Sequence, residues 1–180
     1  IRPQQPLDCF QPHRSGLQVI MISWSRGLDF GFAQKSLALF ARSEYGQEYF
    51  YYSFFDDLYN TSGKSITIFK SIILRNSGDD YYRTMFRDAF LQSLADGMDV
   101  DRQAYRPAIV FLNGVFWGIH NIREKINENY LAAHYPHVDP DNVDILGSYD
   151  SDIVEGDSTD FNNLLDYIET HDLSSNSNYE

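Results

Sequence analysis

The pair Asn113-Gly114 separates two apolar runs and constrains the fold more than any other feature of this sequence. Asn-Gly favours a type I′ turn, because both central residues of that turn need a positive φ angle. We therefore predict a β-hairpin with strands at 108–112 and 115–122. Both faces of the second strand are largely apolar, which predicts a hairpin buried on both sides. The second run ends abruptly in three charged residues, 123–125.

The segments before the hairpin predict three more strands and a helix. The strands are short apolar segments bounded by turn-forming residues, at 17–22, 36–41 and 66–74. The run at 81–95 has apolar residues around most of a helical circumference, so we predict a mostly buried helix with Asp79 or Asp80 as its N-cap. This order predicts an α+β fold in which one helix packs on an antiparallel sheet.

The last third of the sequence predicts a different, mainly helical region. A short helix is expected near 127–134, followed by an acidic linker at 138–160 and a helix at 159–170. The second helix carries an apolar stripe at positions i, i+3, i+4 and i+7, formed by Phe161, Leu164, Leu165 and Ile168. We therefore predict two parts, residues 1–126 and residues 127–180.

Composition narrows the classes of partner. The 180 residues include 26 Asp and Glu against 14 Lys and Arg, which gives a net charge of −12 and a pI near 4.6. This balance argues against a broad basic surface for nucleic acid, and it suits a basic protein partner or a site that needs a cation. The single cysteine, Cys9, excludes an internal disulfide and a cysteine metal cluster. No apolar run approaches the ~20 residues of a membrane span.

Three short motifs suggest sites that the surrounding residues do not support. The segment SGKS at 62–65 has Leu58 where a Walker A motif needs glycine, and it precedes a strand where that motif needs a helix. The acidic segment at 139–144 lacks the glycine and the final glutamate of an EF-hand loop. His134 and His137 have no accompanying ligand set, so we expect a surface pair and no metal site.

Lys35 and the pair Arg87-Asp88 are the charged residues that carry a functional hypothesis. Lys35 stands at the start of an otherwise apolar strand, just after a glycine-bearing loop. A lysine fixed on such a strand can neutralise phosphate oxygens, with a carboxylate on the packed helix as its partner. Arg87 and Asp88 interrupt the predicted helix, and buried charges are costly unless paired. The residues alone leave a structural pair and a nucleotide site equally open.

Four motifs in order resemble the CotH family, the spore coat protein H-like atypical protein kinases. They are SRG…QKSLALFARSEYG, ILRNSGDDYYRTMFRD, RPAIVFLNGVFWGIHNIREKIN and VEGD. The likeness runs from about Gly16 to the C-terminus. It implies a fold similar to protein kinases, with residues 1–126 as a small lobe and 127–180 as the hinge exit and first helices of the large lobe. Characterised members are ATP- and metal-dependent Ser/Thr kinases.

The resemblance also implies roles for individual residues. Arg26 and Lys35 match the family's basic residues at the phosphates, and Lys35 takes the place of the small-lobe lysine. The helix with Arg87 and Asp88 takes the place of the helix packed against that lysine. The hairpin becomes the last two strands of the small lobe, and Glu124 matches a family glutamate where the chain leaves the sheet.

The sequence departs from the family pattern in two ways. Ile22, Ser23 and Trp24 stand where the family usually has a glycine ahead of its Ser-Arg pair. The family's catalytic Asp, companion Asn and metal-binding Asp-x-Asp lie beyond the last residue, so we expect a truncated family member. ATP and Mg²⁺ would act in the parent protein, and this chain alone is expected to be inactive and to hold neither.

The resemblance implies a parent that transfers the ATP γ-phosphoryl group to Ser or Thr of a basic, Ser-rich protein. An acidic chain suits such a substrate. The expected location is extracellular, at a bacterial cell surface or spore coat. We also expect self-association through the apolar stripe of the last helix. The alternative is a non-catalytic surface or coat-assembly module that keeps a kinase-like fold.

Overall fold

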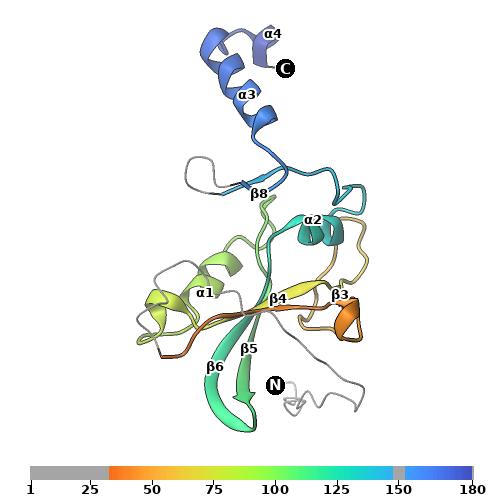
Figure 1. Cartoon of the computed structure of the whole chain (residues 1–180). Helices are drawn as coiled ribbons and strands as arrows, with labels where there is room; N and C mark the ends of the chain where they lie inside the picture. Colours follow the sequence, from red (N-terminus) through yellow and green to blue (C-terminus); the bar gives the residue numbers. More distant parts are fainter. Residues whose placement is uncertain (1–32, 148–152, 180) are drawn as a thin grey trace. The chain divides into compact units, whose positions relative to one another are not determined.

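The computed structural model describes residues 33–147 and 153–179 (Figure 1). The strand predicted at 17–22 and the candidate site residue Arg26 lie outside these ranges. The described residues form antiparallel sheets with a few helices, so the predicted α+β class is confirmed.

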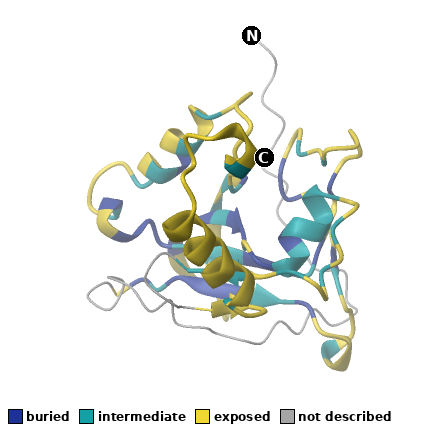
Figure 2. Cartoon of the chain, turned by 90° about the horizontal axis from the view of Figure 1, so that it is seen from above, coloured by how far each residue is buried: buried dark blue, intermediate teal, exposed yellow. Residues whose placement is uncertain are grey.

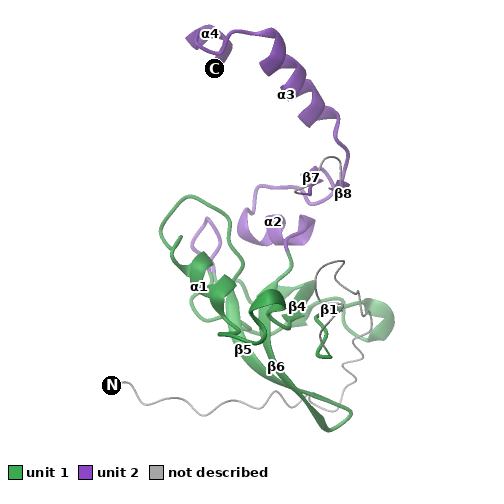
Figure 3. Ribbon diagram, turned by 90° about the vertical axis from the view of Figure 1, so that its left-hand side faces the viewer, with its two compact units in different colours: residues 1–58, 65–125 green, residues 59–64, 126–180 purple. Residues whose placement is uncertain are grey.

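The chain divides into two compact units, which Figure 3 colours separately. The first comprises residues 1–58 and 65–125, and the second comprises residues 59–64 and 126–180. The interpretation of these parts as lobes of a kinase stays a prediction.

The first unit is built on a four-stranded sheet with strand order β1-β4-β6-β5. Every neighbouring pair is antiparallel. The strands are β1 (Leu37–Phe40), β4 (Ser71–Arg75), β5 (Tyr105–Leu112) and β6 (Val115–Glu124). The strand predicted at 36–41 is therefore confirmed as β1 to within one residue at each end.

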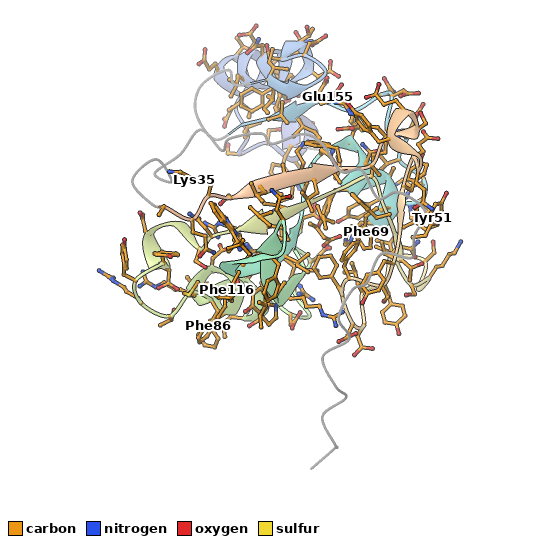
Figure 4. The ribbon with its side chains drawn as sticks, turned by 60° about the horizontal axis from the view of Figure 1, so that its bottom comes forward. Lys35, Tyr51, Phe69, Phe86, Phe116 and Glu155 are labelled. Carbon is orange, nitrogen blue, oxygen red and sulfur yellow. The ribbon has the colours of Figure 1, made fainter. Side chains whose placement is uncertain are left out.

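The hairpin turn forms as its sequence predicts, but its burial differs from the prediction. Asn113 and Gly114 have φ angles of 52° and 78°, and Leu112 pairs with Val115 across the turn. The apolar tip is exposed: Val115 and Phe116 have exposed fractions of 67% and 60% (Figure 4 shows Phe116). The expectation of burial on both sides is wrong at the tip, because β4 ends opposite Asn121 and leaves the rest of β6 projecting past it.

The segment predicted as one strand at 66–74 forms two strands. Residues Ile68–Phe69 form β3, which pairs with β2 (Phe50–Tyr51), and β4 begins two residues later at Ser71. The chain thus changes sheet at Lys70. Edge-to-face contacts between aromatic rings pack this small sheet, with the buried Phe69 ring 5.6 Å from both Phe54 and Phe55.

The helix predicted at 81–95 is shorter and more exposed than expected. A 3₁₀ turn, η3 (Gly78–Asp80), comes first, and α1 begins only at Arg87 and ends at Ser93. Ser77, Gly78 and Met85 have φ angles of 78°, 55° and 63°, which a continuous helix does not allow. Phe86 occupies the N-cap position in place of Asp79 or Asp80. Among the residues of α1 only Ala89 is buried, so the expectation of a mostly buried helix is wrong.

The second unit contains α2 (Glu128–His134), β7 (Ile145–Leu146), β8 (Ile153–Glu155), α3 (Thr159–Thr170) and α4 (Asn176–Tyr179). Asn127 caps α2, since its side chain accepts a hydrogen bond from the Tyr130 amide at 3.1 Å. The acidic linker is not entirely loop, because β7 and β8 pair within it. The predicted bounds of α3 are confirmed, and every residue of α3 is exposed (Figure 2).

Candidate functional site

Lys35 lies two residues before β1, at the edge of the described part of the chain (Figure 4). Its side chain is partly exposed, whereas its neighbours Gln34 and Ser36 are buried. The lysine therefore has the position that the sequence predicts, at the start of a largely apolar strand. Its proposed role at phosphates stays a prediction.

Buried polar side chains surround the backbone of Lys35. His120 of β6 donates from Nε2 to the Lys35 carbonyl oxygen at 3.0 Å. Asn76, just after β4, donates from Nδ2 to the Gln34 carbonyl oxygen at 2.7 Å. Both His120 and Asn76 are fully buried, with exposed fractions of 0%. This cluster was not among the residues that we singled out from the sequence.

A second cluster joins α1 to the sheet through one carboxylate and two guanidinium groups. Asp88 Oδ2 accepts from Arg123 Nη1 at 2.5 Å and from Arg75 Nη1 at 2.6 Å. Arg123 has an exposed fraction of 1%, whereas the Asp88 and Arg75 side chains are 43% and 40% exposed. A strand cation therefore does meet a helix carboxylate, and the cations bonded to Asp88 are arginines of β4 and β6.

Burial and charge act in opposite directions on Arg123. Burial lowers the pKa of its guanidinium, and the carboxylate of Asp88 opposes that shift. Its Nη2 donates to the Gln103 carbonyl oxygen at 3.3 Å, while its Nε has no hydrogen-bond partner among the described residues. A buried guanidinium depends on such partners, so Asp88 is its main electrostatic compensation.

Arg87, the other charged residue predicted on this helix, has a different partner. Its Nη2 lies 3.1 Å from Oδ1 of Asp80, whose side chain is almost fully buried. The hydroxyl of Thr84 and the amides of Arg87 and Thr84 donate to the Asp80 carboxylate. These bonds, that of the Thr84 hydroxyl foremost, lower the pKa of Asp80 to about 2. Asp80 therefore holds the turn between β4 and α1.

Glu124, expected where the chain leaves the sheet, is the last residue of β6. Its carboxylate is buried and accepts from the Ala104 amide at 3.0 Å, while its carbonyl oxygen accepts from Gln103 Nε2 at 2.7 Å. These two bonds fix the segment before β5 against the end of β6. Lys125, the next residue, places its Nζ 5.3 Å from the centre of the Phe40 ring.

Sequence reasoning missed the buried residues Asn76, His120 and Arg123, and the signal for them was weak. Each is a polar residue within or beside an apolar strand, which predicts a buried polar group only if the strand is buried on that face. Which polar residues meet depends on strand register, and register was not predictable from composition.

A family model described as CotH kinase protein matches residues 27–180. The chain belongs to this family. The match includes Lys35, Arg87, Asp88 and Glu124, and Arg26 lies one residue before it. Neither the search of curated proteins nor the search of solved structures gave a match.

The described part of this CotH chain shows neither a metal-ligand cluster nor a membrane-spanning helix. Residues 33–147 and 153–179 contain no group of three or more His, Cys, Asp or Glu side chains arranged to hold a metal ion. Within the same ranges, no helix combines the length and the apolar character needed to cross a membrane.

Proposed function

We propose that this chain forms the ATP-binding side of a CotH-type kinase, which transfers the γ-phosphoryl group of ATP to Ser or Thr of a protein. The observation that carries this proposal is the bond between Asp88 on α1 and the strand arginines Arg75 and Arg123, within a chain that the CotH kinase family model matches. In protein kinases a helix carboxylate pairs with the strand lysine that contacts the phosphates; here the strand cations bonded to the helix carboxylate are arginines.

In this proposal Lys35 and Arg26 bind the phosphate oxygens of ATP, and Glu124 fixes the chain where it leaves the sheet. ATP supplies the phosphoryl group when it is bound. The cationic groups of Lys35 and Arg75 suit its charge, because each is partly exposed next to the sheet. Residues 33–147 and 153–179 contain no group of three or more His, Cys, Asp or Glu side chains that could hold a metal ion, so no Mg²⁺ ligand is named among them. We assign no step of the reaction to a metal held by these residues.

The distribution of charge supports a basic substrate, and it agrees with the Ser-rich basic protein expected from the sequence. The residues of the second unit, 59–64 and 126–180, include thirteen Asp and Glu against one Lys. Those of the first unit include thirteen of each sign. The net charge of −12 is therefore carried by the second unit, which would attract a basic polypeptide at long range. We place the protein outside the cell, at a cell surface or spore coat, and we expect no nucleic-acid partner.

The alternative function is a non-catalytic module for surface or coat assembly. Exposed apolar residues favour it, because the hairpin tip and the α3 stripe both present large side chains to solvent. Self-association through the exposed stripe of Phe161, Leu164, Leu165 and Ile168 is expected with either function. The charge of the second unit opposes it, since two copies would bring like charges together.

Transfer of radiolabelled γ-phosphate by the full-length protein tests the proposal. Lys35→Ala should abolish autophosphorylation and leave the fold intact, because one lysine at a strand edge contributes mainly electrostatics at the reacting phosphate. Lys64→Ala is the matched control, since Lys64 is an exposed lysine of the other unit. Full activity of Lys35→Ala would remove Lys35 from the site. Two results together would favour the assembly module. The wild-type protein would be inactive, and any coding sequence after Glu180 would encode no Asp-Asn pair followed by Asp-x-Asp.

A further inference from the structure

Residues 34–36 enter the sheet without strand pairing, and buried side chains supply their hydrogen bonds. Pairing of β1 with β4 starts at Leu37, which lies opposite Leu74. Before that point, the carbonyl oxygens of Gln34 and Lys35 accept from Asn76 and His120 respectively. Backbone polar groups in a buried segment need partners, so these two side chains replace the missing ladder.

Asn76 binds this segment at more than one point. Besides the bond from its Nδ2 to Gln34, the Oδ1 of Asn76 accepts from the Ser36 hydroxyl at 3.1 Å. The backbone amide of Asn76 donates to the Ser36 Oγ at 3.1 Å. The same Oδ1 accepts from the Gly78 amide at 2.9 Å. The side chain therefore ties both neighbours of Lys35 to the turn after β4.

His120 binds the segment through one tautomer of its ring. The Lys35 carbonyl can only accept, so Nε2 carries the hydrogen of that bond. Nδ1 is then an acceptor, and Gln34 Nε2 lies 3.1 Å from it. Gln34 Nε2 also donates to the Ile119 carbonyl at 2.6 Å. The ring thus links β6 to Gln34 and Lys35 together.

Gly118 leaves the space that Gln34 occupies. A Cβ atom at this position would lie 2.2 Å from Gln34 Oε1, and its φ angle is +136°. Both the conformation and the close approach therefore require glycine. Gln34 is consequently held from two sides, by the β6 backbone and by His120.

We propose that His120, together with Asn76 and Gln34, is a positioning group that fixes the backbone of Lys35 and so directs its ammonium group to the phosphates of ATP. This inference rests on the proposed function of Lys35. Burying polar side chains is costly, and a flexible lysine reaches a fixed target only if its backbone is fixed. A displacement of ~1 Å at a positioned group can cost ~100-fold in rate.

Labelling of Lys35 in the full-length protein by an ATP acyl-phosphate reagent tests this proposal. The reagent acylates a lysine next to its phosphates, and mass spectrometry of the Lys35 peptide measures the rate. His120→Leu removes the ring donor and should slow labelling about tenfold or more. His120→Gln places an amide near the Nε2 position and should stay within about twofold of the wild type. The rate at which a simple amine-reactive reagent acetylates Lys35 should be equal in all variants.

Ile72→Val is the control for general destabilisation, because Ile72 is a buried residue of β4 outside this cluster. It should label like the wild type. If His120→Leu does not fold, His120→Asn replaces it, since its amide is too short to reach the Lys35 carbonyl. Any of three results would overturn the proposal. His120→Leu could label Lys35 at the wild-type rate, or the labelling rate could fall as much in His120→Gln as in His120→Leu. The third result is an equal fall in the labelling rate of Ile72→Val.

Absence of labelling in the wild type would instead reject the proposed role of Lys35. Amide hydrogen exchange at residues 34–37 then tests only whether His120 fixes the backbone of this segment. Exchange about tenfold faster in His120→Leu than in Ile72→Val would retain His120 as the group that fixes this segment. Equal exchange in the two variants would reject that part as well.

Discussion

Asp88→Ala is the sharpest test of how α1 is attached to the sheet. The substitution removes the carboxylate that Arg123 and Arg75 share. The Arg75 bond joins two groups that are about 40% exposed, so its loss should cost only ~0–1 kcal/mol. The Arg123 bond involves a guanidinium that is 1% exposed, and a hydrogen bond to a charged group contributes ~1.5–3 kcal/mol. We therefore expect a loss of ~2–3 kcal/mol in the free energy of unfolding.

This value is below the ~3–5 kcal/mol typical of breaking a fully buried pair, because Asp88 is 43% exposed and water can partly replace it. Urea unfolding at neutral pH, followed by tryptophan fluorescence, measures the change. Arg75→Ala is the control and should cost ~0–1 kcal/mol. In the double variant Asp88→Ala/Arg123→Met, the loss should be at least ~1 kcal/mol smaller than the sum of the single losses. A cost of Asp88→Ala equal to that of Arg75→Ala would refute the reasoning.

Three further predictions concern single residues of the two units. Gly118→Ala should destabilise by ~1–3 kcal/mol in urea unfolding, because its Cβ would overlap Gln34 at a positive φ angle, and a neutral effect would contradict the close contact. Burial lowers the pKa of His120 from its ordinary value of 6.5, so the unfolded chain takes up the proton first and stability should fall as the pH drops below 6.5. His120→Gln should remove that part of the pH slope, and an unchanged slope would contradict the assignment. Asn127→Ala should cost ~1 kcal/mol and lower helical ellipticity through loss of the α2 N-cap, whereas unchanged ellipticity would exclude the cap.

The sequence correctly predicted the hairpin turn and α3, whose signals lie within a few neighbouring residues. The Asn-Gly pair predicted the hairpin turn, and the spacing of apolar residues predicted α3 with its observed ends. Both features depend on neighbours within a few residues, through turn geometry and helical periodicity. The prediction of one helix over 81–95 was wrong, because Asp80 binds Thr84 and Arg87 and so forms a turn. The periodicity of apolar residues does not reveal such side-chain bonds.

For the candidate site, sequence and resemblance located Arg87 and Asp88 on a helix, Glu124 at a strand end and Lys35 just before a strand, while Arg26 lies outside the described residues. Sequence could not state what these side chains contact. Asp88 has Arg123 as its buried partner across 35 positions of sequence, and the Lys35 carbonyl meets His120 across 85. Such contacts depend on the register of β4 and β6 and on where α1 begins.

The sequence by itself determined the α+β class, the hairpin turn, the last long helix and membership of the CotH family. Each follows from short-range backbone preferences, hydrophobic periodicity or ordered motifs. Only the tertiary structure decided burial within the hairpin, where the polar base is buried and the apolar tip is exposed. The physical reason is the extent of the segments that cover β6: β4 pairs with it only from Asn121 to Glu124, and residues 34–35 contact the buried His120. Burial of β6 therefore follows these tertiary contacts and not its hydropathy.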